Sequence, residues 1–226
     1  MSESNANIAV ITIDGPDKNY LNPEVMAQVG ADLIAADKDA SVTAILVTGA
    51  GDAFCGGLDL ASIRAGGDPI EFARSLAVLL KIFPKLTKPV AAAVNGDAVA
   101  SGASIVAACD YAVSIPSAKI GSYEVSVGVW PMVAQVPLIA RMGTKVAMEN
   151  IGAGEPFTVQ RAFEVGLVNR IAEPGELVSA ASEWLTLASR GGAANAGRTF
   201  FYELAEMSYE DGLDAALDKF AAQFKK

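Results

Sequence analysis

The sequence contains no histidine, only two cysteines and no long hydrophobic run. Without histidine, neither a Ser-His-Asp triad nor a Cys-His pair can form, and metal ions lose their commonest ligand, so we predict no metal site. Acid–base chemistry must then use carboxylates, lysine, tyrosine or cysteine. No apolar stretch has the length that is needed to span a bilayer, so we predict no membrane partner.

Cysteine and positive charge are also scarce. The two cysteines, Cys55 and Cys109, do not indicate a disulfide framework and fit a reducing compartment, so we predict a cytoplasmic protein. The N-terminal segment MSESNAN is polar and lacks the apolar core of a signal peptide, and we expect it to be a short disordered lead-in. A net charge of −9 argues against a nucleic-acid partner.

The 226 residues, of which 52% are hydrophobic, predict an α/β fold with strands and helices in alternation. Such alternation is typical of a parallel sheet with right-handed crossovers. We expect one core domain over residues 1–190 and a helical C-terminal extension over residues 191–226. The main strands are expected at 8–13, 43–47, 89–95, 110–114 and 167–171. The main helices are expected at 23–37, 68–85, 101–108, 133–142, 145–151, 175–190, 193–207 and 211–224.

The stretch VNGDAVASGASIVAA, residues 94–108, organises the chain. A strand ends in small residues, and Ser101-Gly102-Ala103 opens an apolar helix. The first N–H groups of a helix have no intrahelical partner and lie at the positive end of its dipole, so this turn can hold a negative oxygen. Tight packing of the strand against the helix is the alternative explanation.

A second stretch, DAFCGGLDL at residues 52–60, follows the strand expected at 43–47. Gly56 and Gly57 allow a sharp turn that leaves the N–H of Leu58 accessible. Loops that follow neighbouring parallel strands converge above the carboxyl ends of the sheet. Two N–H groups that point at one oxygen would form an oxyanion hole.

Together, the two stretches resemble the crotonase (enoyl-CoA hydratase/isomerase) superfamily, and the resemblance runs from about residue 8 to residue 173. FCGGLDL matches the pattern F-[SCA]-[AG]-G-x-D-[LI], and NGDAVASG matches N-G-x-x-x-G-G-G except that Ala100 and Ser101 replace two glycines. The resemblance implies a crotonase-like core, a spiral of ββα units. It also implies that the two oxyanion-hole donors are the main-chain amides of Leu58 and Ser101.

The hydratases of this superfamily generally use two glutamates, and the resemblance assigns their positions to Ser104 and Glu124. One carboxylate is therefore present and one is missing. Moving a double bond requires a single base that removes a proton and returns it at another carbon. We therefore predict a Δ3-Δ2-enoyl-CoA isomerase in which Glu124 is the proton shuttle.

The resemblance also implies where an acyl-CoA substrate would bind. The loop DKNYLN would lie along the coenzyme. Lys18 would lie near a phosphate, and Tyr20 would pack against the adenine. Tyr20 replaces the alanine that is usual at this position. A solvated surface position is the alternative for Lys18. Asp59 is expected to cap a turn or a helix beside the site. Asp59 is also counted among the predicted substrate-binding residues. The others are Leu21, Phe54, Gly56, Gly57, Leu60, Gly102, Ser104 and Trp130.

Two alternatives remain open at this stage. One is a hydratase that uses Glu124 with a water held by Ser104. The other is a non-catalytic acyl-CoA-binding protein, which the changed glycine run and the missing carboxylate favour. In either case the resemblance implies no separate cofactor, because coenzyme A is part of the substrate. It also implies a homotrimer or a dimer of trimers.

Overall fold

A computed structural model describes residues 6–224, so most of the predicted disordered lead-in lies outside the described residues. Its centre is a parallel five-stranded sheet with the strand order β1-β2-β3-β5-β8. Strand β3 is buried along its whole length, which explains why its sequence reads as a continuous apolar run. The strands are β1 (Ile8–Ile13), β2 (Ala44–Gly49), β3 (Val90–Val94), β5 (Tyr111–Ser114) and β8 (Arg170–Ile171).

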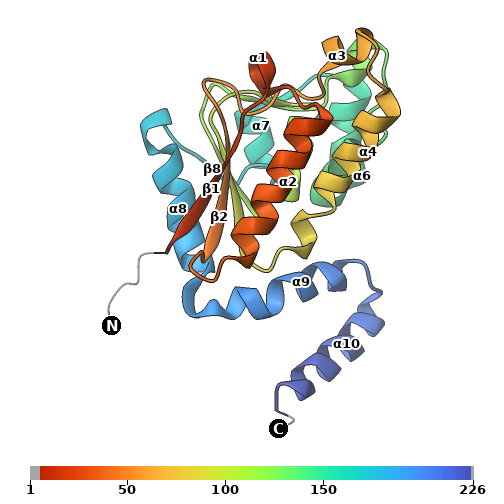
Figure 1. Cartoon of the computed structure of the whole chain (residues 1–226). Helices are drawn as coiled ribbons and strands as arrows, with labels where there is room; N and C mark the ends of the chain where they lie inside the picture. Colours follow the sequence, from red (N-terminus) through yellow and green to blue (C-terminus); the bar gives the residue numbers. More distant parts are fainter. Residues whose placement is uncertain (1–5, 225–226) are drawn as a thin grey trace.

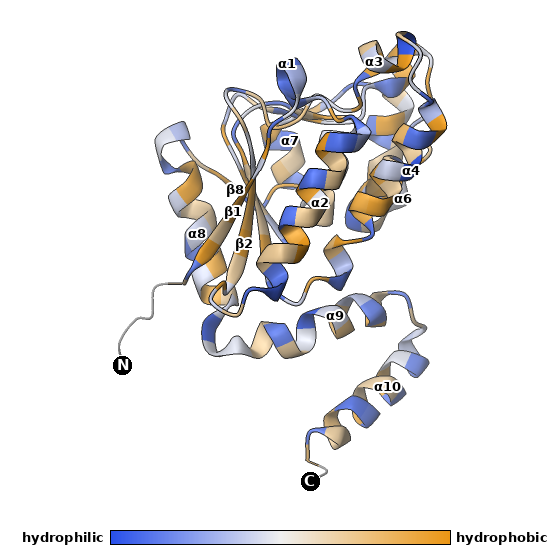
Figure 2. Ribbon diagram, in the orientation of Figure 1, coloured by the Kyte–Doolittle hydropathy of each residue, from blue (hydrophilic) through white to orange (hydrophobic). Residues whose placement is uncertain are grey.

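Helices cover both faces of this sheet, as Figure 1 shows. Helix α2 (Pro23–Lys38) packs on β1 and β2, and α8 (Leu177–Ala188) packs on β2, β3 and β5 from the other face. The strands in Figure 2 are mainly hydrophobic, whereas α2 and α4 (Pro69–Leu80) carry residues of both kinds. The predicted α/β fold with a parallel sheet is therefore confirmed.

A second, three-stranded sheet was not predicted. It consists of β4 (Ala98–Val99), β6 (Lys119–Gly121) and β7 (Phe157–Thr158), with β4 parallel and β7 antiparallel to β6. Strands β4 and β7 have two residues each, which is too few to show alternation in a sequence. Helix α5 (Ser101–Ala108) begins directly after β4 and has the predicted bounds.

The remaining elements differ from the prediction in three places. The helix expected over 68–85 ends at Leu80, and Pro84 lies in a separate turn because proline cannot continue a helix. The helices expected at 133–142 and 145–151 form one element with a kink at Gly143. The last strand is shorter than expected, because the N–H groups of Leu167 and Val168 donate to the carbonyl of Ala162.

The other elements connect these parts. They are α1 (Pro16–Asn19), α3 (Leu60–Arg64), η1 (Phe83–Lys85), η2 (Glu124–Val127), α6 (Gln135–Ala153), α7 (Val159–Glu164), η3 (Pro174–Glu176), η4 (Arg190–Gly192), α9 (Ala193–Ala205) and α10 (Tyr209–Ala222). Within residues 6–224, no helix combines the length and the hydropathy that crossing a membrane requires.

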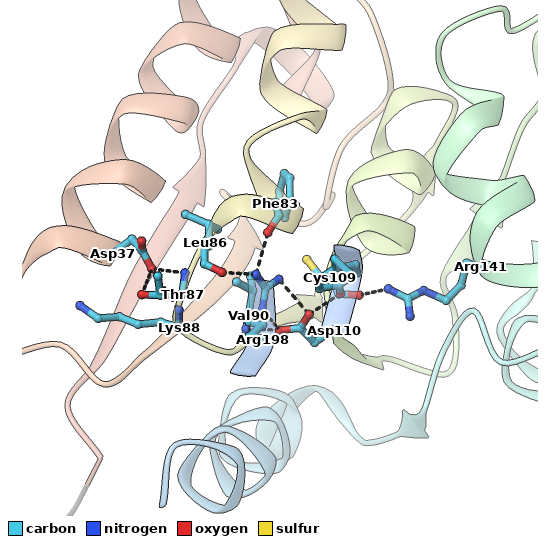
Figure 3. A network of polar contacts seen from close by, with 11 residues as sticks. Asp37, Phe83, Leu86, Thr87, Lys88, Val90, Cys109, Asp110, Arg141 and Arg198 are labelled. Carbon is cyan, nitrogen blue, oxygen red and sulfur yellow. Dashed lines mark hydrogen bonds and ion pairs between the residues drawn. The ribbon is translucent and has the colours of Figure 1, made fainter. Parts of the chain in front are cut away.

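Arg198 fixes α9 to the body of the protein (Figure 3). Its guanidinium donates to both carboxylate oxygens of Asp110 at 2.8 Å, and also to the carbonyls of Phe83 and Leu86. The same carboxylate accepts a hydrogen bond from the N–H of Val90, at the start of β3. Because all these groups are paired, the buried charges are compensated.

Helix α10 contrasts with α9, because it has no buried residue. In Figure 1 it lies away from the sheet and its covering helices. Its exposed side chains include Leu213, Leu217 and Phe220. The division into a core of residues 1–190 and an extension of residues 191–226 remains a prediction.

Candidate active site

A cavity of about 210 Å³ lies next to the loops that follow β2 and β3. Leu58, Ala100, Ser101 and Glu124 all line it. The structure thus brings together the three residues that the sequence predicts to be catalytic. Most of the remaining lining is apolar, which limits competition from water for charged groups inside.

The loop that carries Leu58 is held by main-chain hydrogen bonds. The N–H of Leu21 donates to the carbonyl of Gly57 at 2.8 Å, and the N–H of Asp59 donates to the carbonyl of Leu21 at 2.9 Å. This pairing uses the groups on either side of the Leu58 amide. Within residues 6–224, the Leu58 N–H itself donates no hydrogen bond.

The side chain of Asn19 also holds the loop that carries Leu58, and this residue was not recognised in the sequence. Its side chain is 2% exposed, and its amide donates to the carbonyls of Ala50 and Ala53 at 2.9 and 2.8 Å. The N–H of Gly56 donates to the carbonyl of Lys18. An asparagine in a loop is common, so only the fold reveals that this one bridges two loops.

The second amide belongs to Ser101, the first residue of α5. Before it, Ala100 has φ 53° and ψ −121°, a conformation that is rare for residues other than glycine. A Cβ atom on Gly57 would lie 2.8 Å from the Cβ of Ala100 and 3.7 Å from the nitrogen of Ser101. The two loops therefore meet in a close contact that only glycine at position 57 permits.

The Ser101 N–H also donates no hydrogen bond within the described part of the chain. Two unused amides, from Leu58 and Ser101, thus border one cavity. An oxyanion hole formed by these two amides remains a prediction. We call residues 54–58 and 98–104, which carry these amides, the amide wall.

Glu124 begins the short helix η2 and is held through one carboxylate oxygen. Its Oε2 accepts hydrogen bonds from the Ser122 hydroxyl at 2.5 Å and from the Tyr123 N–H at 3.0 Å. Its Oε1 accepts none from residues 6–224, so it is available to a ligand. Glu124 is the only carboxylate among the described residues that borders this cavity.

Asn150 on α6 positions the segment that carries Glu124. It is fully buried, accepts from the N–H of Ser122 at 2.7 Å, and donates to the carbonyls of Ser122 and Glu155. A Cβ atom on Gly121 would lie 2.8 Å from the Asn150 side chain, so position 121 has no room for one. Asn150 was not recognised in the sequence, because Ser122, the residue that it positions, lies 28 residues before it.

Ser104 does not reach the cavity. Its side chain is fully buried, and its hydroxyl donates to the carbonyl of Ala134 at 2.7 Å. The hydroxyl is therefore occupied within the protein. The position from which a second carboxylate would act in the family's hydratases holds no group that faces the cavity.

Several other predicted substrate-binding residues also lie off the cavity wall. Phe54 and Leu21 are fully buried core residues, and Asp59 caps α3 by accepting from the N–H of Ser62. Gly102 packs so closely on the carbonyl of Cys55 that a Cβ atom would be 2.3 Å away. Their observed contacts are structural. Gly56 and Gly57 likewise shape the loop without lining the cavity.

Lys18 and Tyr20 lie on the loop beside this site. Lys18 is exposed, as the alternative of a solvated lysine requires. The ring of Tyr20 packs against Gly56, where a Cβ atom would be 2.6 Å from Cε1 of that ring. Neither residue borders the cavity.

Seven residues between positions 127 and 134 also line the cavity, and we call the segment 127–134 the apolar wall. Trp130 belongs to it as predicted, but Val127, Val129 and Met132 were not assigned to the site. These three side chains and Trp130 are between 41% and 70% exposed. An apolar run in a loop, here VGVWPMVA, is the sequence signal that identifies such a wall.

Two further groups near the site keep their protons. Burial raises the pKa of the Tyr123 phenol, and the neighbouring Tyr20 and Glu124 raise it further. Burial also raises the pKa of the Cys55 thiol to about 12, which excludes a thiolate nucleophile there at neutral pH. Glu124 is thus the only base at the cavity among the described residues.

Comparison with known proteins shows the family of the chain. The family model described as enoyl-CoA hydratase/isomerase matches residues 3–222. The chain belongs to the enoyl-CoA hydratase/isomerase family. The resemblance to the crotonase superfamily that the two glycine-containing motifs indicated is therefore confirmed.

Individual members show how far the likeness extends. The chain is 32% identical to a short-chain-enoyl-CoA hydratase of Clostridium acetobutylicum, over 80% of this chain and 71% of that protein. It is 29% identical to a crotonyl-CoA hydratase of Syntrophomonas wolfei, over 78% of this chain and 70% of that protein. An enoyl-CoA hydratase structure from Mycobacterium smegmatis superposes with a TM-score of 0.88 at 27% identity, covering 96% of this chain and 88% of that one. The crotonase-like fold is thereby confirmed.

Proposed function

We propose that this protein is a Δ3-Δ2-enoyl-CoA isomerase, which moves a double bond along an acyl-CoA thioester. One observation carries the proposal. Glu124 is the only carboxylate at the cavity within residues 6–224. Ser104, at the position of the hydratases' other glutamate, does not line the cavity, and its hydroxyl is hydrogen-bonded to Ala134. A reaction that needs one base fits this arrangement better than one that needs two. No cofactor takes part apart from the coenzyme A of the substrate.

In this reaction, the amides of Leu58 and Ser101 donate to the carbonyl oxygen of the thioester. Polarisation of this carbonyl makes the C–H bonds at C2 more acidic and stabilises the negative oxygen that forms. Loss of one such donor typically raises a reaction barrier by roughly 3–4 kcal/mol. The unused state of both amides supports this role.

Glu124 then moves the proton. Its Oε1 removes a proton from C2, and the electron pair spreads over a dienolate whose oxygen is bound to the two amides. The resulting carboxylic acid returns the proton to C4, so the double bond moves from C3–C4 to C2–C3. Hydrogen bonds from Ser122 and Tyr123 to Oε2 keep the carboxylate in place during both transfers.

Hydration is the second candidate, because the curated relatives described above are named hydratases. It would require a positioned water in addition to Glu124. The two activities are separated by incubating the protein with 3-enoyl-CoA and, in parallel, with 2-enoyl-CoA. We expect conversion of the first to 2-enoyl-CoA and no hydration of the second.

The opposite result, hydration of 2-enoyl-CoA without isomerisation of 3-enoyl-CoA, would reject the isomerase. Tight binding of acyl-CoA without turnover of either substrate would indicate a non-catalytic binding protein. In each case the product is identified by chromatography of the reaction mixture, so both reactions are measured in one assay format.

We also propose that the protein is a cytoplasmic homotrimer or dimer of trimers. Apolar side chains on α9 and α10, among them Phe201, Leu217 and Phe220, are exposed in the single chain and would be buried between subunits. The two cysteines are buried and unpaired, which supports a reducing compartment. A monomer in light scattering would contradict the assembly.

A further inference from the structure

Ser101 differs from the other buried serines of the described chain. Ser104, Ser114 and Ser122 donate their hydroxyls to oxygen acceptors at 2.7, 3.2 and 2.5 Å. Ser101 is only 2% exposed, yet its hydroxyl makes no hydrogen bond within residues 6–224. A buried polar group without a partner is rare and requires an explanation.

The Ser101 hydroxyl is reached from the cavity. Among the described residues, no side-chain oxygen is both sealed from solvent and without a hydrogen-bond partner. The unpartnered hydroxyl of Ser101 must therefore contact solvent space, and the cavity is the solvent space that this residue borders. The hydroxyl thus belongs to the lining of the same cavity that Leu58 and Ser101, the residues with the two unpaired amides, border.

An acyl thioester that enters the cavity would exclude solvent from this hydroxyl. The lining around it is mostly apolar and offers few replacement acceptors. We propose that the Ser101 hydroxyl is a third hydrogen-bond donor to the thioester oxygen, beside the amides of Leu58 and Ser101. This inference rests on the proposed function, because it assumes that the same oxygen is bound by those amides.

The contribution grows as the reaction proceeds. Hydrogen bonds to a charged oxygen are roughly twice as strong as those to a neutral one. The hydroxyl therefore binds the dienolate more tightly than the thioester and lowers the barrier, rather than only improving substrate binding. Its loss is expected in kcat and not in KM.

The first test measures isomerase kinetics of Ser101→Ala and Ser101→Gly. We expect kcat to fall roughly ten- to a hundredfold in both, the range for a hydrogen bond to a charged group, with little change in KM. Ser114→Ala is the matched control, because it removes another buried serine hydroxyl far from the cavity lining, and it keeps kcat. Equal kcat in the wild type and Ser101→Ala, or a loss confined to KM, would overturn the proposal.

A second test does not depend on turnover. Acetoacetyl-CoA has an acidic C2 position, and its enolate is detected by ultraviolet absorbance when it is bound. We expect the bound enolate fraction to be about tenfold lower in Ser101→Ala than in the wild type, and unchanged in Ser114→Ala. The same enolate fraction in the wild type and Ser101→Ala would overturn the role of the hydroxyl.

The two tests also separate this inference from the proposed function. If the wild type stabilises the enolate through Ser101 but isomerises no enoyl-CoA, the isomerase fails and the third donor stands. If the wild type isomerises 3-enoyl-CoA and Ser101→Ala does so equally well, only the third donor fails. If the wild type neither binds nor converts acyl-CoA, both proposals fail.

Discussion

The two walls of the cavity differ in how they are held. The amide wall is fixed by main-chain pairing, by the Asn19 side chain and by glycines that leave no room for a Cβ atom. The apolar wall consists largely of exposed side chains, and Met132 is 70% exposed. The first wall is held by many contacts and carries the unpaired donors, whereas the second is apolar and largely exposed.

This difference follows from the forces that each wall uses. Stabilising a negative oxygen requires donors in a fixed direction and at hydrogen-bond distance, and a small displacement removes much of the benefit. Apolar contact has no direction and depends mainly on the area that is buried. In the proposed reaction, the amide wall therefore serves the chemistry, and the apolar wall receives the acyl chain. Four variants test this division, and the largest effect comes first.

Glu124→Gln removes the base and keeps the shape of the side chain. We expect isomerase turnover to fall roughly a hundred- to ten-thousandfold, the range for general acid–base catalysis. The melting temperature should change little, because Glu124 is only partly buried. Turnover at the wild-type level, measured with 3-enoyl-CoA, would remove Glu124 from its proposed role.

Gly57→Ala breaks the amide wall. Position 57 has φ 100°, and the new Cβ atom would lie 2.8 Å from that of Ala100. We expect a loss of about 1–3 kcal/mol of unfolding free energy from the strained backbone, and a loss of turnover of roughly a hundredfold from the displaced Leu58 amide. Gly51→Ala is the control, because it also has positive φ but no atom within contact of a new Cβ. Full turnover in Gly57→Ala would contradict a rigid amide wall.

Asn150→Ala tests how the base is held. The substitution leaves the N–H and the carbonyl of Ser122 without their partner in a buried region. We expect the free energy of unfolding to fall by about 2–3 kcal/mol, with a smaller loss of turnover as the Ser122–Glu124 hydrogen bond loosens. Denaturant unfolding and initial rates measure the two effects. Unchanged stability would show that Ser122 is held by other contacts.

Met132→Ala has the smallest expected effect. Because this side chain is mostly exposed, the free energy of unfolding should change by less than about 0.5 kcal/mol. We expect KM for longer acyl chains to rise a few-fold, while kcat stays constant. A large fall in kcat would show that the apolar wall also positions the reacting carbons.

Much of the site could be predicted from the sequence because its donors are main-chain groups. Glycine-rich loops after two strands, and a helix that begins directly after the second, predict where such amides gather. Leu58, Ser101 and Glu124 indeed border one cavity. The pairing of β2 with β3, which brings the loops together, follows from two apolar runs in succession.

The supports of the site could not be predicted in the same way. Asn19 and Asn150 act through hydrogen bonds to segments about 30 residues away, and the sequence contains no pattern for such pairs. Asp59 caps α3, as the sequence predicted. Phe54 and Gly102 were assigned to substrate binding because they lie within the motifs, but they do not line the cavity, and their observed contacts fill and pack the loops. Nearness to a motif does not distinguish a lining residue from a supporting one.

The sequence by itself determined the parallel sheet, the two loops and the family, because hydrophobic periodicity and glycine placement are local properties of the chain. Only the tertiary structure decided which side chains face the cavity. Ser101 and Ser104 show this, because they lie three residues apart on one helix. The hydroxyl of Ser104 donates to the carbonyl of Ala134, whereas that of Ser101 has no partner within residues 6–224 and borders the cavity. That outcome depends on what packs against each side of α5, and residues distant in sequence supply it.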